Sequence, residues 1–414
     1  MNDRSVAYDS RNASLIRWLT YLMFMMFAMT SDAVGSVIPT IIKEFHLTMT
    51  AAGTFHYVPM GAIAVGAILL GFMADRFGRQ RTIIVGLILY GLSSMLFAFG
   101  NSFLFFVGLL AVSGIGISIF KTGALALIGD ISKSTAEHSA RMNTLEGFFA
   151  IGSIIGPAIV ATLLDEGISW KWLYVIAAAI CGLLILLSLS VRYPVAQKAA
   201  DAPATLSHTL KVARNPYALA FSTMIMLYVA VEVAIYVWMP TYLAGYKGTM
   251  TWLPVYALTI FFVLRAAGRF FGAWLLERFS WAWIMALFAT AIFACFLGSL
   301  IFGRDIGAFL LPLSGLFMSM IYPTLNSKGI SCFPKAEHGA AAGVILFFTA
   351  IAAALGPLAM GAVSDAFGSA KYGFALATGF SFLLLVSLLA NLIVNPAEKR
   401  LKSLDNTEYS IAAG

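Results

Sequence analysis

Charged residues are scarce in this chain. Asp, Glu, Lys and Arg make up 11% of its 414 residues, whereas 60% are hydrophobic. So few charges cannot cover a soluble surface, and we expect the chain to lie in lipid. Its three cysteines, Cys181, Cys295 and Cys332, fall in or beside apolar stretches, without the spacing of a zinc site or disulfide framework. Its five histidines are scattered and no nucleophile motif occurs, so we expect no enzyme, no metal and no cofactor.

What the sequence has instead is a series of apolar stretches of about 18 residues or more, the length that crosses about 30 Å of hydrocarbon. They predict an all-α membrane protein, because the strands of a β-barrel need only about ten residues. The twelve predicted spans are residues 14–42, 52–75, 82–99, 103–129, 142–164, 171–191, 214–243, 252–275, 281–302, 306–331, 338–365 and 372–395.

The distribution of positive charge predicts the orientation. Lys and Arg are concentrated at both termini and in every second loop, and the intervening loops hold Lys43, Lys171, Lys247, Arg304 and Lys371. By the positive-inside rule we expect both termini to be cytoplasmic. We expect the membrane itself to be the cell inner membrane. This asymmetry accounts for the net charge of +7 without a nucleic-acid partner. The first span exceeds a signal-peptide core and should remain as a helix.

The spans fall into two groups of six, separated by a polar stretch after Arg192. A shift of 200 residues sets Gly156-Pro157 on Gly356-Pro357 and Asp165 on Asp365. We therefore expect two pseudo-symmetric six-helix bundles, and one chain would enclose a complete pathway as a monomer. The predicted division is residues 1–191 for the N-terminal bundle, 192–213 for a cytoplasmic linker, 214–395 for the C-terminal bundle and 396–414 for a cytoplasmic tail.

A charged turn rich in glycine and arginine follows the second span, and a weaker copy, Glu277-Arg278-Phe279-Ser280, follows the eighth. We interpret the first turn as a gating loop that holds helix ends and biases the open and closed states without touching substrate. Its candidate residues are Gly71, Asp75, Arg76, Gly78 and Arg79.

Ionisable residues inside the spans are the candidates for function. Each costs about 2.5 to 3.5 kcal/mol at a helix centre, so we expect them to face water or one another. Arg269 and Lys328 lie near cytoplasmic ends, where a long side chain can reach the surface, although a substrate role for Lys328 is equally open. The full set is Asp32, Lys121, Glu146, Glu232, Arg265, Arg269 and Lys328.

Two of these acids, Asp32 and Glu232, are 200 residues apart, which makes them near mates in the repeat. A carboxyl group in a partly dry cavity beside a cation can take up and release a proton near neutral pH. We therefore predict that both take part in proton coupling. The alternative is a buried ion pair with Lys121 or Arg265.

Glu146 follows Asn143 by three residues, so both share one helical face. They would bind a polyhydroxylated ligand there, or Glu146 would pair with Lys121 from the preceding helix. Glu146 is also the third candidate for proton coupling.

Aromatic side chains near these charges are further candidates, although most aromatics in such a chain pack or anchor helices. Tyr236 and Trp238 lie about one turn beyond Glu232, and a ring beside a carboxylate commonly holds a sugar. Tyr322 and Phe348 complete the predicted substrate-binding residues.

Four stretches carry a family resemblance: Tyr228-Val-Ala-Val-Glu232, Gly268-Arg269-Phe270-Phe271-Gly272, Phe317-Met-Ser-Met-Ile-Tyr322-Pro323-Thr324 and Arg141-Met-Asn143-Thr-Leu-Glu146. They resemble the fucose:proton symporter family of the major facilitator superfamily, including its glucose/mannose branch. The resemblance implies that the two bundles enclose a central site near the bilayer midplane. It also implies uptake of a monosaccharide with an ion, usually a proton, through polar residues of the first, fourth, fifth and seventh helices.

One position departs from that family. Its symporters carry an acid in the fourth helix, and here the place falls on Lys121, followed by Thr122. Lys121 and Arg265 would then meet a carboxylate or phosphate, so the substrate would be a sugar acid or another organic anion. Asp32, Glu232 or Glu146 would have to carry the proton.

The predicted function is proton-coupled uptake of a monosaccharide or sugar-derived molecule by alternating access, with the substrate, protons and the lipid bilayer as partners. The alternative is proton-driven efflux of sugars or drugs. Gly152-Ser-Ile-Ile-Gly156-Pro157 partly matches an exporter motif, but Gly-Pro recurs at residues 356 and 357, so close helix packing is the preferred interpretation. A membrane enzyme or sensor is the third class, and no site motif or appended domain supports it.

Overall fold

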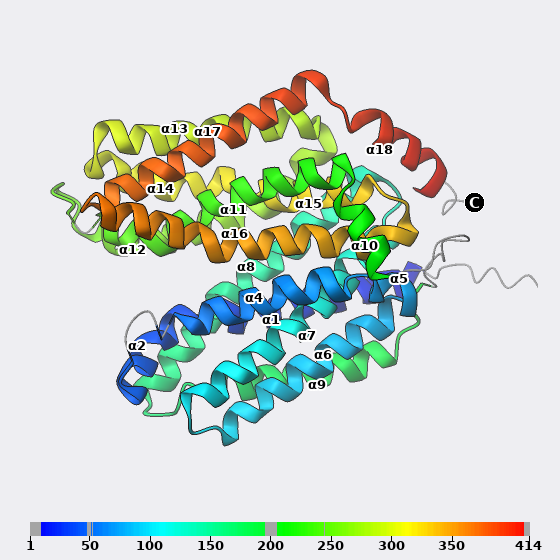
Figure 1. Cartoon of the computed structure of the whole chain (residues 1–414), viewed down its shortest axis with the longest axis horizontal. Coiled ribbons are helices and arrows are strands. Elements are labelled where there is room, and N and C mark those ends of the chain that lie inside the picture. Colours follow the sequence, from blue (N-terminus) through cyan, green and yellow to red (C-terminus); the bar gives the residue numbers. More distant parts are fainter. Residues whose placement is uncertain (1–9, 48–50, 52, 195–204, 244, 410–414) are drawn as a thin grey trace, which may run out of the picture.

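The structure is a computed structural model that describes residues 10–47, 51, 53–194, 205–243 and 245–409. Within these ranges the chain is helical and contains no strand. Among the described residues, eleven helical segments are long and apolar enough to cross a membrane, with α14 and α15 counted as one, and Thr54–Leu70 is a shorter apolar helix of 17 residues. Figure 1 shows them in two bundles, α1 to α9 and α11 to α17. The predicted all-α fold with two pseudo-symmetric bundles is confirmed.

The N-terminal bundle contains α1 (Ser10–Ser31), α2 (Val34–Phe45), α4 (Thr54–Leu70), α5 (Met73–Phe77), α6 (Arg79–Met95), the 3-10 turn η1 (Leu96–Phe99), α7 (Phe103–Asp130), α8 (Thr135–Asp165) and α9 (Trp172–Leu189). The C-terminal bundle contains α11 (Pro216–Leu243), α12 (Trp252–Arg278), α13 (Trp281–Phe302), α14 (Arg304–Met318), α15 (Ile321–Ser331), the 3-10 turn η2 (Lys335–Glu337), α16 (His338–Ala366) and α17 (Ala370–Val394).

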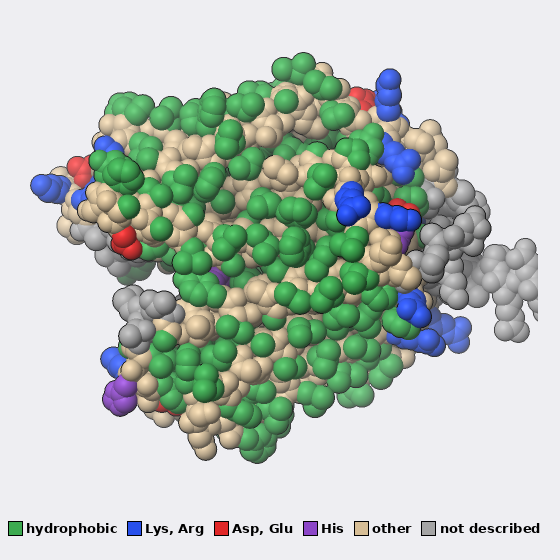
Figure 2. All heavy atoms as spheres, viewed as in Figure 1, with side chains coloured by type: hydrophobic (Ala, Val, Ile, Leu, Met, Phe, Trp, Pro, Cys, Tyr) green, Lys and Arg blue, Asp and Glu red, His purple; other side chains and the backbone are tan. Residues whose placement is uncertain are grey.

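Short helices also form in the described parts of the expected linker and tail: α10 (Leu206–Ala213), α18 (Glu398–Leu404) and the π-helical turn η3 (Asp405–Tyr409). Helices α5, α10 and α18 all lie at one end of the molecule (Figure 1). At this end the bundles are in contact, and we call it the closed end. At the opposite end, on the left in Figure 2, a cleft separates them, and we call it the open end.

Local chemistry explains where several helices begin. The side chains of Ser102, Ser134, Thr205 and Ser369 each accept a hydrogen bond from a backbone N–H of the following helix. These residues satisfy donors that have no partner within the helix, which is why they mark helix starts.

Two of the predicted spans are interrupted well inside their length, whereas the second is interrupted only near its end, at Gly71 and Phe72. The first span breaks at Asp32 and Ala33, between α1 and α2, and the tenth breaks at Ser319 and Met320, between α14 and α15. The break in the tenth span has a covalent cause, since Pro323 has no N–H to donate to the Ser319 carbonyl four residues earlier. Irregular backbone at membrane depth is tolerated where protein or a watery cavity covers it, and transporters place binding sites at such breaks.

Glycines bring helices together in two places. A Cβ atom at Gly152 or Gly156 of α8 would lie 2.1 Å and 2.0 Å from the carbonyl oxygens of Met25 and Met29, so these glycines allow α1 to lie directly on α8. Between the bundles, a Cβ atom at Gly71 would lie 3.0 Å from the Cα of Gly343. The closed end therefore depends on this close backbone approach.

Candidate transport site and closed end

Glu232 and Arg265 form an ion pair in the middle of the C-terminal bundle. Arg265 Nη2 of α12 lies 2.5 Å from Glu232 Oε1 of α11. Glu232 is 6% exposed, and the hydroxyl group of Tyr228, one turn earlier on α11, donates to the same oxygen at 2.7 Å. The sequence left open whether Glu232 pairs with Lys121 or Arg265, and in this conformation its partner is Arg265.

Glu146 and Arg269 connect the two bundles. Arg269 Nη1 of α12 donates to the backbone oxygen of Glu146 in α8 at 2.6 Å, and Nη2 lies 3.4 Å from Glu146 Oε2. The second contact has the distance of an ion pair without the geometry of a hydrogen bond. Arg269 has no exposed surface, so it does not reach the molecular surface as its sequence position suggested. Its Nε also donates to Ser319 O at the break in the tenth span, at 3.4 Å.

Lys121 of α7 sits among aromatic rings of the N-terminal bundle. Its ammonium nitrogen lies 5.3, 5.2 and 5.4 Å from the ring centroids of Phe24, Phe27 and Phe149. Within the described residues it forms no ion pair, because the nearby acid Glu146 is bound to Arg269. Cation–π contacts contribute about 0.5 to 2 kcal/mol each, but they supply no acceptor for the three N–H donors of the ammonium group.

Asp32 lies at the break in the first span and is exposed. Its carboxylate accepts hydrogen bonds from Ser31 Oγ at 2.9 Å and from Ser153 Oγ of α8 at 2.5 Å. In the part of the chain that the structure describes, Asp32 forms no ion pair with Lys121 or with Arg265, whose partner is Glu232. Ser153 lies between the two close-packed glycines of α8, so the contact of α1 with α8 positions this acid.

The predicted aromatic residues are spread over the C-terminal bundle. Tyr236 stacks on Phe262 with centroids 6.3 Å apart, and Trp238 Nε1 donates to Pro357 O at 3.3 Å. Tyr322 is buried with its ring 6.4 Å from that of Tyr228, the residue that donates to Glu232. Phe348 is half-buried against Phe347, at 5.4 Å.

Two other candidate residues lie at the contact between the bundles. Asn143 Nδ2 donates to Thr324 Oγ1 of α15 at 3.2 Å, and the amide oxygen of Asn143 is buried without a hydrogen-bond partner. Lys328 is 4% exposed and donates to Thr135 O at 3.0 Å. It lines a 270 Å³ pocket beside α18, so the structure places it at the closed end rather than with Glu232.

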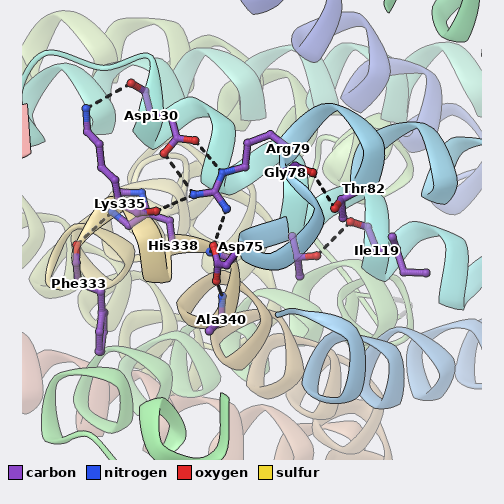
Figure 3. A network of polar contacts seen from close by, with 12 residues as sticks. Asp75, Gly78, Arg79, Thr82, Ile119, Asp130, Phe333, Lys335, His338 and Ala340 are labelled. Atoms are coloured by element: carbon purple, nitrogen blue, oxygen red, sulfur yellow. Dashed lines mark hydrogen bonds and ion pairs between the residues drawn. The ribbon is translucent and has the colours of Figure 1, made fainter. Parts of the chain in front are cut away.

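Two gating-loop residues, Asp75 and Arg79, lie at the centre of the network of Figure 3, at the closed end. Asp75 is 9% exposed and accepts from the backbone N–H groups of Gly339 and Ala340, both at 2.8 Å, at the start of α16. Arg79 donates to Asp75 at 2.5 Å, to Asp130 at 2.7 Å and to Lys335 O at 2.6 Å. A carboxylate at a helix N-terminus is stabilised by the N–H groups and the helix dipole.

Two other gating-loop residues, Gly78 and Arg76, lie outside these ion pairs. Gly78 has φ +88°, a conformation that favours glycine, and ends α5, whereas Arg76 is exposed over the ring of Phe77. A second cap, which the sequence gave no reason to expect, joins the C-terminal tail to the N-terminal bundle. Asp405 Oδ1 accepts from the backbone N–H of Thr135, at the start of α8, at 2.8 Å.

No group of three or more potential metal ligands occurs within the described residues. Two bundles in contact at one end and parted at the other, with buried charges between them and two interrupted helices, are the architecture of a secondary transporter.

The profile of the Major Facilitator Superfamily matches residues 20–357 and 256–411, and the chain belongs to this superfamily. It is a transporter family, so the chain is not an enzyme. Among solved structures, FucP in its outward conformation has a TM-score of 0.77 at 23% identity, covering 91% of this chain and 99% of that one. The proton:xylose symporter XylE has a TM-score of 0.74 at 13% identity, covering 93% and 97%. The human organic anion transporter MFSD10 has 0.70 at 16%, covering 91% and 99%.

Curated relatives match parts of the chain. Protein TsgA of Salmonella typhimurium is 24% identical over 254 residues, 60% of this chain and 60% of its own length. Multidrug resistance protein 1 of Bacillus subtilis is 31% identical over 193 residues, 45% of this chain and 47% of its own length. The chain thus spans less than two thirds of the relatives it matches, and their names do not agree on a substrate.

Proposed function

We propose that this protein is a proton-coupled symporter that takes up an anionic sugar-derived molecule, or a similar small organic acid, by alternating access. The observation that carries the anionic part is that Lys121, at the centre, contacts aromatic rings and has no acidic partner among the described residues. Of the three cations there, Arg265 binds Glu232 and Arg269 binds Glu146, whereas Lys121 is held by rings. Asp32 is a third acid, and its hydrogen bonds go to serines. A carboxylate or phosphate on the substrate would supply the acceptors that Lys121 lacks.

Proton coupling is assigned to Glu232, with Asp32 and Glu146 as the further candidates. Glu232 is nearly buried, and its charge is balanced by Arg265. A proton on Glu232 would release that arginine, so protonation changes which groups the site can bind. The solved symporters with the same fold are described as coupled to protons, which is consistent with this assignment.

We also propose that the closed end faces the cytoplasm of a cell with an inner membrane, and that the chain acts as a monomer. The positive-inside pattern of the loops supports this orientation. The structure would then represent an outward-facing state, with the cleft of Figure 2 as the entrance.

The substrate class can be tested by thermal denaturation of the purified protein with neutral sugars, amino sugars and the sugar acids gluconate and glucuronate. A ligand at a hundred times its Kd stabilises the folded state by about 2.7 kcal/mol. We expect sugar acids to stabilise the wild type and Lys121→Gln to lose that effect. Lys402→Gln is the control, because this lysine side chain is 72% exposed. Stabilisation by neutral sugars alone, equal in both proteins, would reject an anionic substrate.

Coupling of transport to protons can be tested in proteoliposomes, with the sugar acid that stabilises the protein in the thermal assay as the substrate. Glu232→Gln should still exchange substrate across the membrane but should no longer accumulate it against a gradient, because glutamine cannot carry the proton. The surface variant Glu398→Gln should accumulate as the wild type does. Concentrative uptake by Glu232→Gln at the wild-type rate would remove Glu232 from the coupling mechanism.

Efflux remains the second candidate, since the similarity to a multidrug resistance protein is the highest identity among the relatives named above. Inverted vesicles energised with a proton gradient distinguish the two directions. Accumulation inside such vesicles would indicate antiport and export.

A further inference from the structure

One hydroxyl group in the central cluster faces two acceptors. The Tyr228 oxygen lies 2.7 Å from Glu232 Oε1 and 2.9 Å from the backbone oxygen of Met318. A phenol carries one hydrogen, so at any moment Tyr228 can donate fully to only one of them. Tyr228 has no exposed surface. Water therefore does not compete for this hydrogen, and the surrounding protein groups determine which of the two acceptors receives it.

The second acceptor exists because the tenth span is broken. Met318 is the last residue of α14, and α15 begins at Ile321. Carbonyl groups at a helix C-terminus have no partner within the helix and need an outside donor. Tyr228 supplies one to Met318, and Arg269 supplies another to Ser319. Since Arg269 also binds Glu146 of the other bundle, the break is joined to the contact between bundles.

The protonation state of Glu232 decides where the phenol hydrogen goes. An ionised carboxylate only accepts, and hydrogen bonds to charged groups are about twice as strong as neutral ones, so Tyr228 donates to Glu232. Once a proton from the cleft binds Glu232, the carboxylic acid can donate to the Tyr228 oxygen. The phenol hydrogen then turns to Met318. Tyr228 keeps its own proton throughout, and the transported proton later leaves from Glu232.

We propose that Tyr228 couples the protonation state of Glu232 to the helix break at Ser319 and Met320, because its hydroxyl group changes acceptor from Glu232 to the Met318 carbonyl when Glu232 is protonated. This inference rests on the proposed function, since it requires Glu232 to bind the coupled proton. Tyr228 acts here as a positioning residue, because its hydroxyl group changes partner and holds no substrate.

Other groups around Glu232 contribute to its field and are left unchanged by the test. They come from its own helix, from α12, from α15 and from the N-terminal bundle. Tyr236, Arg265, Arg269 and Tyr322 interact with Glu232 directly, and Asp32 and Glu146 interact with these same residues.

The test uses protons alone as the probe. Spin labels are placed at Arg81→Cys and Arg278→Cys, exposed positions on α6 and α12 at the closed end, and the three native cysteines are buried. The distance between labels is measured in the full-length protein from pH 8 to pH 5.5. We expect acidification to shift the wild type between two distance populations. Tyr228→Phe should reduce the change in their ratio by about tenfold, the worth of one hydrogen bond to a charged group.

The control is Tyr242→Phe, which removes an equally buried hydroxyl group that donates to Ser299 O at 2.9 Å away from the cluster. It should leave the pH response intact. If Tyr228→Phe is unstable, Pro323→Ala provides a second variant. It restores the N–H that can bond Ser319 O, and it too should weaken the response.

The outcomes separate this inference from the proposed function. A normal pH response in Glu232→Gln would refute proton binding at Glu232 and therefore the coupling mechanism. A response lost in Glu232→Gln but retained in Tyr228→Phe would leave that mechanism standing and overturn the role of Tyr228. Equal loss in Tyr228→Phe and Tyr242→Phe would also overturn it, because the effect would then be structural.

Discussion

Replacing Asp75 by Asn should open the closed end. Asp75 accepts from two N–H groups of α16 and from Arg79, and it is buried. The amide of Asn can accept through one oxygen only, and its NH2 group would face a donor. A hydrogen bond to a charged group is worth about 1.5 to 3 kcal/mol, and Asn keeps at most one of the two bonds that cross to α16, so we take about 3 kcal/mol as the cost. Arg79 retains its ion pair with Asp130. Because Gly339 and Ala340 belong to the other bundle, most of this loss is specific to the closed state.

A cost of about 3 kcal/mol corresponds to roughly a hundredfold change in the ratio of closed to open molecules. The spin-label pair at Arg81→Cys and Arg278→Cys measures that ratio directly. Asp165→Asn is the matched control, because this aspartate is exposed at the end of α8. A distance distribution identical to that of the wild type would show that capping of α16 does not hold the bundles together.

Two further variants test neighbouring parts of the same reasoning. Asp405→Asn should shift the label distances in the same direction as Asp75→Asn, but with a smaller free-energy cost of about 1 kcal/mol or below. The reason is that Asp405 is half-buried and Asn can still accept from the backbone N–H of Thr135. An effect as large as that of Asp75→Asn would contradict this ranking. Gly156→Ala should lower the free energy of unfolding by about 1 to 3 kcal/mol, seen as a lower melting temperature, because its Cβ atom would lie 2.0 Å from Met29 O. Gly182→Ala, with nothing within 4 Å of the added Cβ atom, should be neutral or stabilising. Equal effects of the two substitutions would rule out the close approach of α1 and α8.

The sequence was sufficient for the fold because apolar length and loop charge are local properties. The 200-residue repeat even places His138 and His338 in register, and their rings stack at the closed end with centroids 6.1 Å apart. The two helix breaks were not predicted, because hydropathy averages over a window and does not register the loss of one or two hydrogen bonds. Pro323 was the available signal for the second break.

The pairing of the central charges was harder to predict from the sequence than the fold. Glu146 was expected to contact Lys121 or a ligand, and the structure joins it to Arg269 of the other bundle. Such a contact depends on how the bundles dock, which no periodicity reports. The capping role of Asp405 was hidden for the same reason, since its partner Thr135 lies 270 residues away in sequence. The side chain of Glu277, in the weaker copy of the gating loop, lies outside the described residues.

The proposed proton site at Glu232 and the contact between bundles are joined by a single helical turn. Arg265 and Arg269 are four residues apart on α12, so their side chains share one face. Arg265 binds Glu232 within its own bundle, and Arg269 binds Glu146 across the interface. Because the turn between them is rigid, a movement of α12 that follows release of Arg265 must also displace Arg269. Protonation of one buried acid can therefore act on the bundle interface without any long pathway of intermediate residues.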